Sequence, residues 1–377
     1  MIREGDVQWW VLEAKKHPQS APTIIEELAK RLVELDAENE RLRDEIIRLQ
    51  HRAPAAAGSA EVSALRHEVT TLRRLLESEA SGEPSVVFLS DRLQAARAPL
   101  PQVERLAHEG RPALDSRALL GHRCLLLLAH PHHELLMLTS QGRGLKMQPS
   151  DVPSLVEGGD WPISEGQELA AGERLTAAVA VAEPPRFWTV VTRRGYVRQF
   201  LRIGFDRNLA RGDQLIESPF HNDEPVAIVN GDRGDLLLIT RWGKGVRFPQ
   251  RAIAAQGSVG LELDPDDEVI AALPLPSDTE ILIVTAAGYV MRRDTSQSLL
   301  KARSRPGGAG KSLIQAYDVL GIFPCKPQAR LLYLTYSGKL AFVSTADIPL
   351  HTRSRKGARA RTFDRDPAVA VRLVPEL

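Results

Sequence analysis

One short pattern, repeated at a nearly constant interval, constrains the fold of this chain more than any other feature. It occurs six times between Ser85 and Val343 and consists of an apolar run, a Ser or Thr, a tight turn that usually ends in Gly, and a short run with Arg or Lys. Aligned on the Ser or Thr, the copies are 49, 53, 48, 45 and 50 residues apart, at Ser90, Thr139, Thr192, Thr240, Thr285 and Thr335. A period near 50 is typical of stacked or radially arranged units. The sequence therefore predicts a repeated supersecondary unit rather than one ordinary domain.

Each copy has the composition of a β-hairpin. Val, Ile, Leu and Thr favour a pleated strand, and a three-residue link that ends in Gly suits a type I turn followed by a residue with positive φ. The Gly residues in that place are Gly142, Gly195, Gly243, Gly288 and Gly338. The first copy has Asp91 and Arg92 after Ser90 and no Gly, so we expect its hairpin to turn differently or to fray.

The residues between the hairpins predict further strands. About 30 residues follow each hairpin and contain another apolar stretch, such as EPVAIV from Glu224 or DEVIAALPL from Asp267. This length suffices for two more short strands, which gives four strands per repeat. Six repeats of four strands predict a mainly β fold in which the blades form a closed disc.

The region before the repeats predicts a coiled coil at residues 23–50. Its heptad positions are filled by Ile25, Leu28, Leu32, Leu35, Asn39, Leu42, Ile46 and Leu49. Leu at every d position and one Asn at a central a position favour a parallel two-stranded coil, and hence a homodimer. The alternative interpretation is a single amphipathic helix that packs on the disc.

Three further segments surround this coil. Residues 1–22 contain Trp9 and Trp10, of which one is either exposed as a contact for a partner or packed. Residues 51–60 form a small-residue linker with a Pro. Residues 61–80 predict a second helical segment, which is either more coil or an antiparallel return onto the first helix.

Composition indicates a cytoplasmic protein without a bound metal or cofactor. The N-terminus lacks the apolar core of a secretory signal, the two Cys residues are far apart, and no apolar run is long enough to span a bilayer. The segments HPHHE from His130 and DPDDE from Asp264 are expected to be solvated turns. GGAGKS from Gly307 is not a phosphate loop, because the first Gly of that motif would fall on Arg305.

Positive charge is concentrated near the C-terminus. Residues 281–377 contain 16 Lys plus Arg against 6 Asp plus Glu, and because the whole chain carries +1, residues 1–280 carry −9. A basic patch of this kind is typical of a protein that contacts a phosphate backbone, although a solvated Arg-rich surface is the other interpretation.

The repeated pattern resembles the C-terminal domain of bacterial DNA gyrase A and of its counterpart in topoisomerase IV. The segment TAAGYVMRRDTSQSLLKARSRPGGAGKSL from Thr285 carries the resemblance most clearly. It covers residues 85–377 and implies a six-bladed, propeller-like β-pinwheel, preceded here by an α-helical coiled coil. In that family, the basic rim of the pinwheel bends DNA around itself.

The same resemblance points to two loops as DNA contacts. Residues 303–311 are the nearest counterpart of the family's Gln-Arg-Arg-Gly-Gly-Lys-Gly box, from which Pro306 and Ala309 depart, and they lie in the fifth repeat instead of the first. Residues 353–361 hold the corresponding place in the sixth repeat. Arg forks bind phosphate oxygens in pairs, and Gly lets backbone N–H groups approach closely. The expected DNA-binding residues are Arg292, Arg293, Arg303, Arg305, Lys311, Arg353, Arg355, Lys356, Arg359 and Arg361.

No catalytic site is expected. The family's DNA-cleaving Tyr belongs to a domain that precedes the pinwheel, whereas all five Tyr residues of this chain lie inside the repeats. The sequence therefore predicts a non-enzymatic, nucleoid-associated dimer that binds duplex DNA. Two other hypotheses are an accessory subunit that supplies DNA wrapping to a separately encoded topoisomerase core, and a protein-interaction scaffold that does not bind DNA.

Overall fold

The computed structural model describes residues 82–115, 123–157, 168–232, 234–297, 300–315, 318–326, 328–351, 356–363 and 365–375. The chain divides into two compact units, residues 1–71 and 72–377, and every described residue lies in the second. The predicted coiled coil, the Trp pair and the second helical segment lie outside the described residues. Dimerisation through the heptads therefore stays a prediction.

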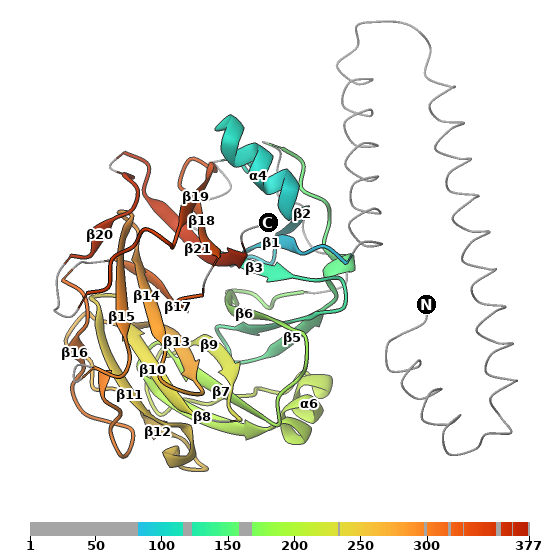
Figure 1. Ribbon diagram of the computed structural model, residues 1–377. Coiled ribbons are helices and arrows are strands. Elements are labelled where there is room, and N and C mark those ends of the chain that lie inside the picture. The colour runs from blue at the N-terminus through green and yellow to red at the C-terminus, as the bar shows by residue number, and fades with distance from the viewer. Residues whose placement is uncertain are drawn as a thin grey trace, which may run out of the picture. The chain divides into compact units, whose positions relative to one another are not determined.

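The described strands form six separate antiparallel sheets, numbered 1 to 6 here in chain order (Figure 1). The apolar run of each repeat is a strand inside its sheet, with another strand on both sides. These central strands are β1 (Ser85–Ser90), β4 (Glu134–Thr139), β7 (Phe187–Thr192), β10 (Asp235–Thr240), β14 (Glu280–Thr285) and β18 (Ala329–Thr335). Their hairpin partners are β2 (Ala95–Pro99), β5 (Gly144–Met147), β8 (Tyr196–Leu201), β11 (Lys244–Pro249), β15 (Tyr289–Asp294) and β19 (Leu340–Ser344). The predicted hairpins are thus present in all six repeats.

The Ser or Thr of each repeat stabilises the hairpin turn through its side chain. In every copy its hydroxyl oxygen accepts a hydrogen bond from the backbone N–H four residues later, at 3.1 to 3.3 Å. The third turn residue has positive φ, from 76° to 83° at the predicted glycines that follow Thr139, Thr192, Thr240, Thr285 and Thr335. The expectation that the first hairpin turns differently was wrong. Leu93 adopts φ 64° and donates its N–H to the carbonyl of Ser90, so a buried Leu completes the same turn.

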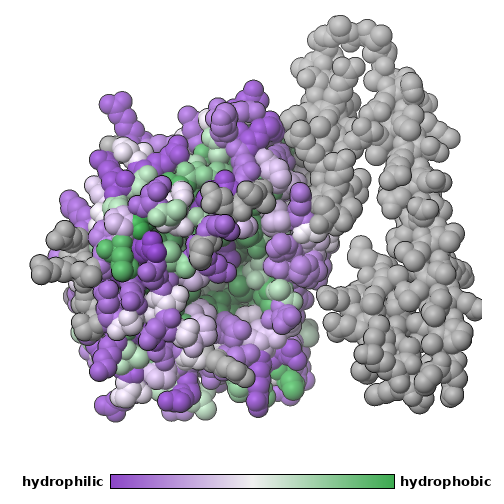
Figure 2. Space-filling model, viewed as in Figure 1, coloured by the Kyte–Doolittle hydropathy of each residue, from purple (hydrophilic) through white to green (hydrophobic). Residues whose placement is uncertain are grey.

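A third strand of each repeat lines the centre of the ring. These inner strands are β3 (Cys124–Ala129), β6 (Leu175–Val181), β9 (Pro225–Asn230), β13 (Val269–Leu275), β17 (Val319–Pro324) and β21 (Ala368–Pro375). Each contacts the next, and β21 contacts β3, so the inner strands surround a central cavity of about 800 Å³. Figure 2 shows hydrophobic residues inside the hollow in the middle of this face.

The fourth edge of each sheet comes from the following repeat. Three such segments are strands: β12 (Ser258–Val259) pairs with β8, β16 (Lys311–Ser312) with β11, and β20 (Ala358–Arg359) with β15. Single bridges replace the strand elsewhere, from Ser154 to sheet 1, from Gln214 to sheet 2 and from Pro112 to sheet 6. The prediction of four strands within each repeat was therefore wrong in its pairing, because the outer edge is exchanged between neighbours. The bridge between Pro112 and Lys339 joins the first repeat to the last.

The hydrophobic core consists of six clusters, each between two neighbouring sheets. Alternate residues of a central strand point to opposite neighbours: Val87 and Leu89 pack toward sheet 2, whereas Val86 and Phe88 pack toward sheet 6. Because both faces are buried, the central strands are continuously apolar instead of alternating with polar residues. The cluster between sheets 1 and 6 shows that the ring is closed.

Two α-helices occur in the described part of the chain, α4 (Leu100–Glu109) and α6 (Arg202–Arg211). Each follows the second strand of a hairpin, and each ends at a Gly in the left-handed conformation. Short 3-10 turns, η2 (Pro149–Asp151) and η3 (Gln250–Ala252), take the same place in sheets 2 and 4. No helix in the described ranges is long and apolar enough to cross a membrane.

Candidate nucleic-acid interface

The two basic segments singled out from the sequence lie on the outer edges of neighbouring sheets. Residues 303–311 lead into β16, which pairs with β11 of sheet 4, and residues 356–361 include β20, which pairs with β15 of sheet 5. The two segments are about 50 residues apart in the chain, and strand exchange places both at the periphery of the ring (Figure 1). A single extended ligand that follows the periphery would meet both.

Arg303 holds the first of these segments in shape. Its guanidinium donates hydrogen bonds to the carbonyls of Gly307 and Ala309, each at 2.6 Å. Gly307 and Gly308 have φ of 108° and 78°, values that favour glycine. The loop is also attached to the exchanged segment of sheet 3, because the N–H of Gly307 donates to the carbonyl of Gly260. Arg303 is therefore used to position the loop, and it is only half exposed.

A small basic pocket of about 260 Å³ lies beside this loop. The charged residues that line it are Arg247, Lys301, Arg303 and Lys311, and no carboxylate is among the described residues of its wall. Arg247 is nevertheless paired, with Asp235 and Asp278, each at 2.7 Å. Lys301 and Lys311 are exposed and supply the positive charge toward solvent. A site of this size and charge suits a single phosphate group.

The second segment presents three exposed cations, Lys356, Arg359 and Arg361. The guanidinium of Arg359 lies over the ring of Tyr289, 5.7 Å from its centroid, and Arg361 donates to the carbonyl of Phe342 at 3.4 Å. Arg353 and Arg355 lie outside the described residues. The structure thus gives this edge at least three positive charges at the surface.

The structure places Arg292 and Arg293 differently from the other candidates. Arg292 forms an ion pair with Glu280, with Nε 2.7 Å from the carboxylate, and this hydrogen bond raises the pKa of the guanidinium. Arg293 is 1% exposed, where sheet 4 has the buried Phe248, and burial lowers its pKa. Its Nε donates to the carbonyl of Leu313 at 2.8 Å. Neither side chain presents an unpaired charge to solvent.

Arg247 and Lys301 were missed by the sequence reasoning. Arg247 occupies the fourth position after the turn Gly, as Arg292 does in the next repeat, and Lys301 precedes Arg303 by two residues. The repeat alignment contains the signal for Arg247. Its place in a pocket with Lys311 depends on strand exchange, which no local pattern indicates.

A different set of arginines surrounds the ring axis on the face that carries the Ser/Thr turns. In this turn-face network, Arg174 lies 2.9 Å from Glu224, Arg241 lies 2.9 Å from Asp318, and weaker pairs at 3.6 to 4.0 Å connect the rest. Its members are Arg123, Arg174, Arg193, Arg241, Glu224, Glu268 and Asp318. Each arginine here faces at least one carboxylate, and the pairs link neighbouring sheets.

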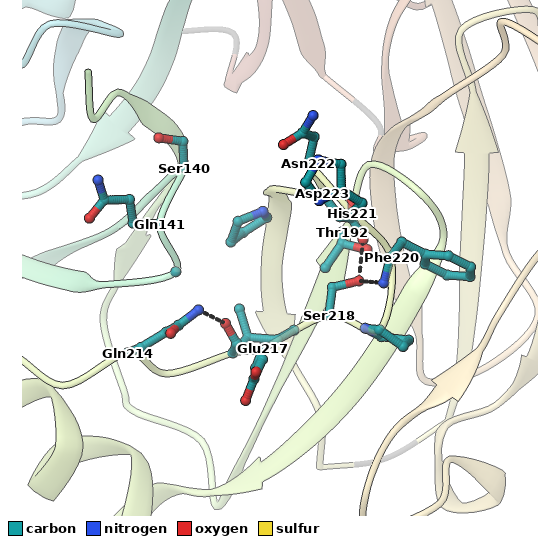
Figure 3. Close-up of a pocket in the computed structure, with 14 residues that line it drawn as sticks. Ser140, Gln141, Thr192, Gln214, Glu217, Ser218, Phe220, His221, Asn222 and Asp223 are labelled. Carbon is teal, nitrogen blue, oxygen red and sulfur yellow. Dashed lines mark hydrogen bonds between the residues drawn. The ribbon is translucent and has the colours of Figure 1, made fainter.

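A pocket of about 410 Å³ opens on the same face between sheets 2 and 3 (Figure 3). Its wall includes Ser218, Phe220, His221 and Asp223. The Ser218 hydroxyl donates to Asp223 at 2.5 Å and accepts the N–H of Phe220 at 3.2 Å. These bonds close the loop 218–223 on itself, so the Ser–Asp pair braces the loop.

Three histidines also cluster, with the ring centroids of His130, His132 and His133 between 4.7 and 5.5 Å apart. Burial, together with the two neighbouring rings, lowers the pKa of His133 to about 4. No group of three or more His, Cys, Asp or Glu side chains is arranged to hold a metal ion in the part of the chain that the structure describes.

Comparison with known proteins agrees with this geometry. A family model described as the DNA gyrase C-terminal domain, a β-propeller, matches residues 133–155 and 234–276. DNA gyrase A of Staphylococcus aureus is 26% identical over 247 residues, which cover 62% of this chain and 28% of that protein. The chain therefore matches less than a third of the length of these relatives.

Two solved structures share the fold. The C-terminal domain of DNA gyrase A superposes with a TM-score of 0.62 at 19% identity, over 77% of this chain and 99% of that one. The C-terminal domain of DNA topoisomerase IV superposes with a TM-score of 0.55 at 17% identity, over 78% of this chain and 94% of that one. The resemblance found in the repeats is thus confirmed, and the repeated part of this chain is a β-pinwheel of the type that forms the C-terminal domain of DNA gyrase A.

Proposed function

We propose that this chain is a non-catalytic protein that binds and bends duplex DNA along the outer edges of sheets 4 and 5. In this interpretation the six sheets are the blades of a six-bladed pinwheel, which begins at residue 85. The proposal keeps Arg305, Lys311, Lys356, Arg359 and Arg361 as phosphate contacts, together with Arg353 and Arg355, and adds Lys301. Arg303 becomes a positioning residue, and Arg292 and Arg293 are structural.

The observation that carries the proposal is the difference in pairing between basic surfaces. The arginines of the turn-face network each face a carboxylate, whereas Lys301, Arg305 and Lys356 have no ion pair with any described residue and are exposed. Unpaired cations on a continuous edge can replace the counterions of a phosphate backbone. No helix in the described ranges is arranged to read bases, and the aromatic content of 5% offers few stacking platforms, so duplex is favoured over single strands.

The domain organisation follows from the same proposal. The heptads at residues 23–50 would join two copies in parallel, after an N-terminal segment at 1–22 and before a linker at 51–60 and a second helical segment at 61–80. A dimer would place two basic edges on one DNA molecule, which raises the effective concentration of the second contact. The chain would then act in the cytoplasm on the nucleoid, without metal or cofactor.

A second candidate function is that of an accessory subunit that supplies DNA wrapping to a separately encoded topoisomerase core. It is favoured by the match to gyrase A, which covers only 28% of that protein. This function uses the same basic edge and differs in its partner, which the segment before residue 82 would recruit. Co-purification of the full chain with a topoisomerase core would distinguish it from independent DNA binding.

The test is binding of the full-length chain to a linear duplex of about 150 base pairs, one persistence length, at several salt concentrations. The double variant Arg305→Gln/Lys356→Gln is expected to reduce the slope of log K against log salt by about 1.8, since each phosphate contact contributes about 0.9. The matched control is Arg92→Gln/Arg194→Gln, which removes the same charge from two exposed turn residues.

Loss of slope in the first variant alone would support the proposal. Equal effects of both variants, or no binding by the unaltered chain at low salt, would overturn it and leave the scaffold hypothesis.

A further inference from the structure

We propose that helix α6 is a second duplex-DNA contact, which extends the binding edge from sheets 4 and 5 across sheets 3 and 2. This inference rests on the proposed function and adds residues that lie outside the two basic loops. It concerns the solvent face of α6, which carries Ile203, Arg207 and Arg211.

The inner face of α6 fixes the helix firmly to the ring. Phe205 is 1% exposed and packs against Trp188 and Phe200, with ring centroids 5.9 and 6.0 Å apart. Leu209 packs on sheet 2 at Gly144, where an added Cβ would lie 2.2 Å from its side chain. The helix therefore bridges sheets 2 and 3, and its opposite face has a defined direction toward solvent.

That opposite face combines unpaired cations with an exposed aliphatic side chain. Ile203 is 73% exposed, more than any other large hydrophobic residue that the structure describes. Arg207 and Arg211 are exposed, and neither forms an ion pair or hydrogen bond with another described residue. The helix's one carboxylate, Asp206, lies 4.0 Å from Lys146 of sheet 2 and does not neutralise them.

This arrangement costs stability, so folding alone does not account for it. Two arginines four residues apart on one helix face repel each other. An exposed Ile also leaves apolar surface in water. Both costs would be offset by a ligand that carries closely spaced negative charges beside an apolar surface.

Duplex DNA has this chemistry. Guanidinium groups four residues apart are separated by about 6 Å along the helix axis, which suits phosphates of one backbone. An aliphatic residue between such arginines can contact the sugar and base edges of a groove, as apolar wedges of DNA-bending proteins do. In Figure 1, β20, β16, β12, β8 and α6 follow one another along the periphery of the ring, so α6 continues the proposed edge.

The test uses the full-length chain and two linear duplexes, of about 15 and about 60 base pairs, which span roughly 50 and 200 Å at 3.4 Å per base pair. For Arg207→Gln/Arg211→Gln, the slope of log K against log salt should fall by about 1.8 on the long duplex and stay unchanged on the short one, which the loops of sheets 4 and 5 bind alone. Arg92→Gln/Arg194→Gln serves as the matched control. Ile203→Ala should reduce DNA bending on the long duplex, measured by the cyclisation rate, and leave the salt slope unchanged.

The outcomes separate this inference from the proposed function. Binding by Arg207→Gln/Arg211→Gln with an unchanged slope on the long duplex would overturn the role of α6 and leave the loops as the contact. Failure of the unaltered chain to bind either duplex would overturn both proposals. An effect equal to that of the control variant would also overturn the α6 contact, since general charge would then explain it.

Discussion

The turn-face network and the outer edge of sheets 4 and 5 are both rich in arginine, yet they use it in opposite ways. On the turn face, Arg174 and Arg241 each lie 2.9 Å from a carboxylate of the next repeat. On the outer edge, Arg305 and Lys356 are exposed and face no carboxylate among the described residues. The count of cations is thus a poor guide to a phosphate-binding surface, and the distribution of carboxylates is the better one.

The difference has a physical reason in the fold. The turn face is where each inner strand enters the ring next to the preceding turn, so the chain ends of two sheets meet there and ion pairs can join them. The outer edge is made by exchanged strands that lie alone at the periphery. Charges there have no neighbouring repeat to pair with, and they remain available to a ligand.

The largest expected effect concerns a paired arginine of the turn region. Arg143 binds Glu173 through two hydrogen bonds, at 2.8 and 2.5 Å, and the Glu173 side chain is fully buried. Burial raises the pKa of Glu173, but the hydrogen bonds from Arg143, Thr139 and the Ala170 N–H outweigh it and lower the pKa from 4.5 to about 2.

A carboxylate with a lowered pKa stabilises the fold above pH 4.5, and this contribution is lost as the pH falls toward 2. Glu173→Gln should therefore cost about 3 kcal/mol at pH 7 and progressively less below pH 4.5, as measured by urea unfolding. Arg305→Gln on the outer edge should change stability by less than about 0.5 kcal/mol. Equal costs for the two variants would contradict the distinction between the two surfaces.

An intermediate effect is expected when the turn-face network is unpaired. Glu224→Gln/Glu268→Gln removes two carboxylates that face Arg123, Arg174, Arg193 and Arg241. If pairing is what keeps these arginines from DNA, the variant should gain about two phosphate contacts, and its slope of log K against log salt should steepen by about 1.8. An unchanged slope, in a variant that is shown to be folded, would mean that geometry and not pairing excludes this face.

The smallest effect separates charge from position on the outer edge. Arg303→Lys keeps the charge but loses the planar fork that holds the carbonyls of Gly307 and Ala309. DNA affinity should fall several-fold, about 1 kcal/mol, because the loop is no longer held. Arg305→Lys, which changes no observed contact, should bind as the unaltered chain does in the same titration. A similar loss in both would show that Arg303 contacts DNA directly.

Local patterns predicted much of the fold. The period, the hairpins, the positive φ of the turn glycines and the closed arrangement all follow from spacing and residue type. Leu93 was missed, because a buried Leu in the left-handed conformation contradicts local preference and is maintained by core packing. The exchange of outer edges was also missed, since the partner of a two-residue strand depends on which sheet lies next to it in space.

The candidate site was less predictable than the fold. Adjacent arginines look equivalent in sequence, yet Arg292 pairs with Glu280 while Arg293 points into the core. Arg303 and Arg305 differ just as strongly, one being bound to its own loop and the other exposed. Only the positions of carbonyls and carboxylates from other repeats distinguish these roles.

The exchange of edges also has a consequence for synthesis. Each sheet lacks its outer edge until the next repeat has left the ribosome, so completion follows translation by one repeat. The first repeat is the exception: its residues 112–114 must find Gly338, whose carbonyl accepts the N–H of Ala113. At 5 to 20 residues per second, that partner appears roughly 10 to 45 seconds later. Through that interval the segment between α4 and β3 has no edge to join, and a nascent chain is the form of this protein in which we expect chaperones to find it.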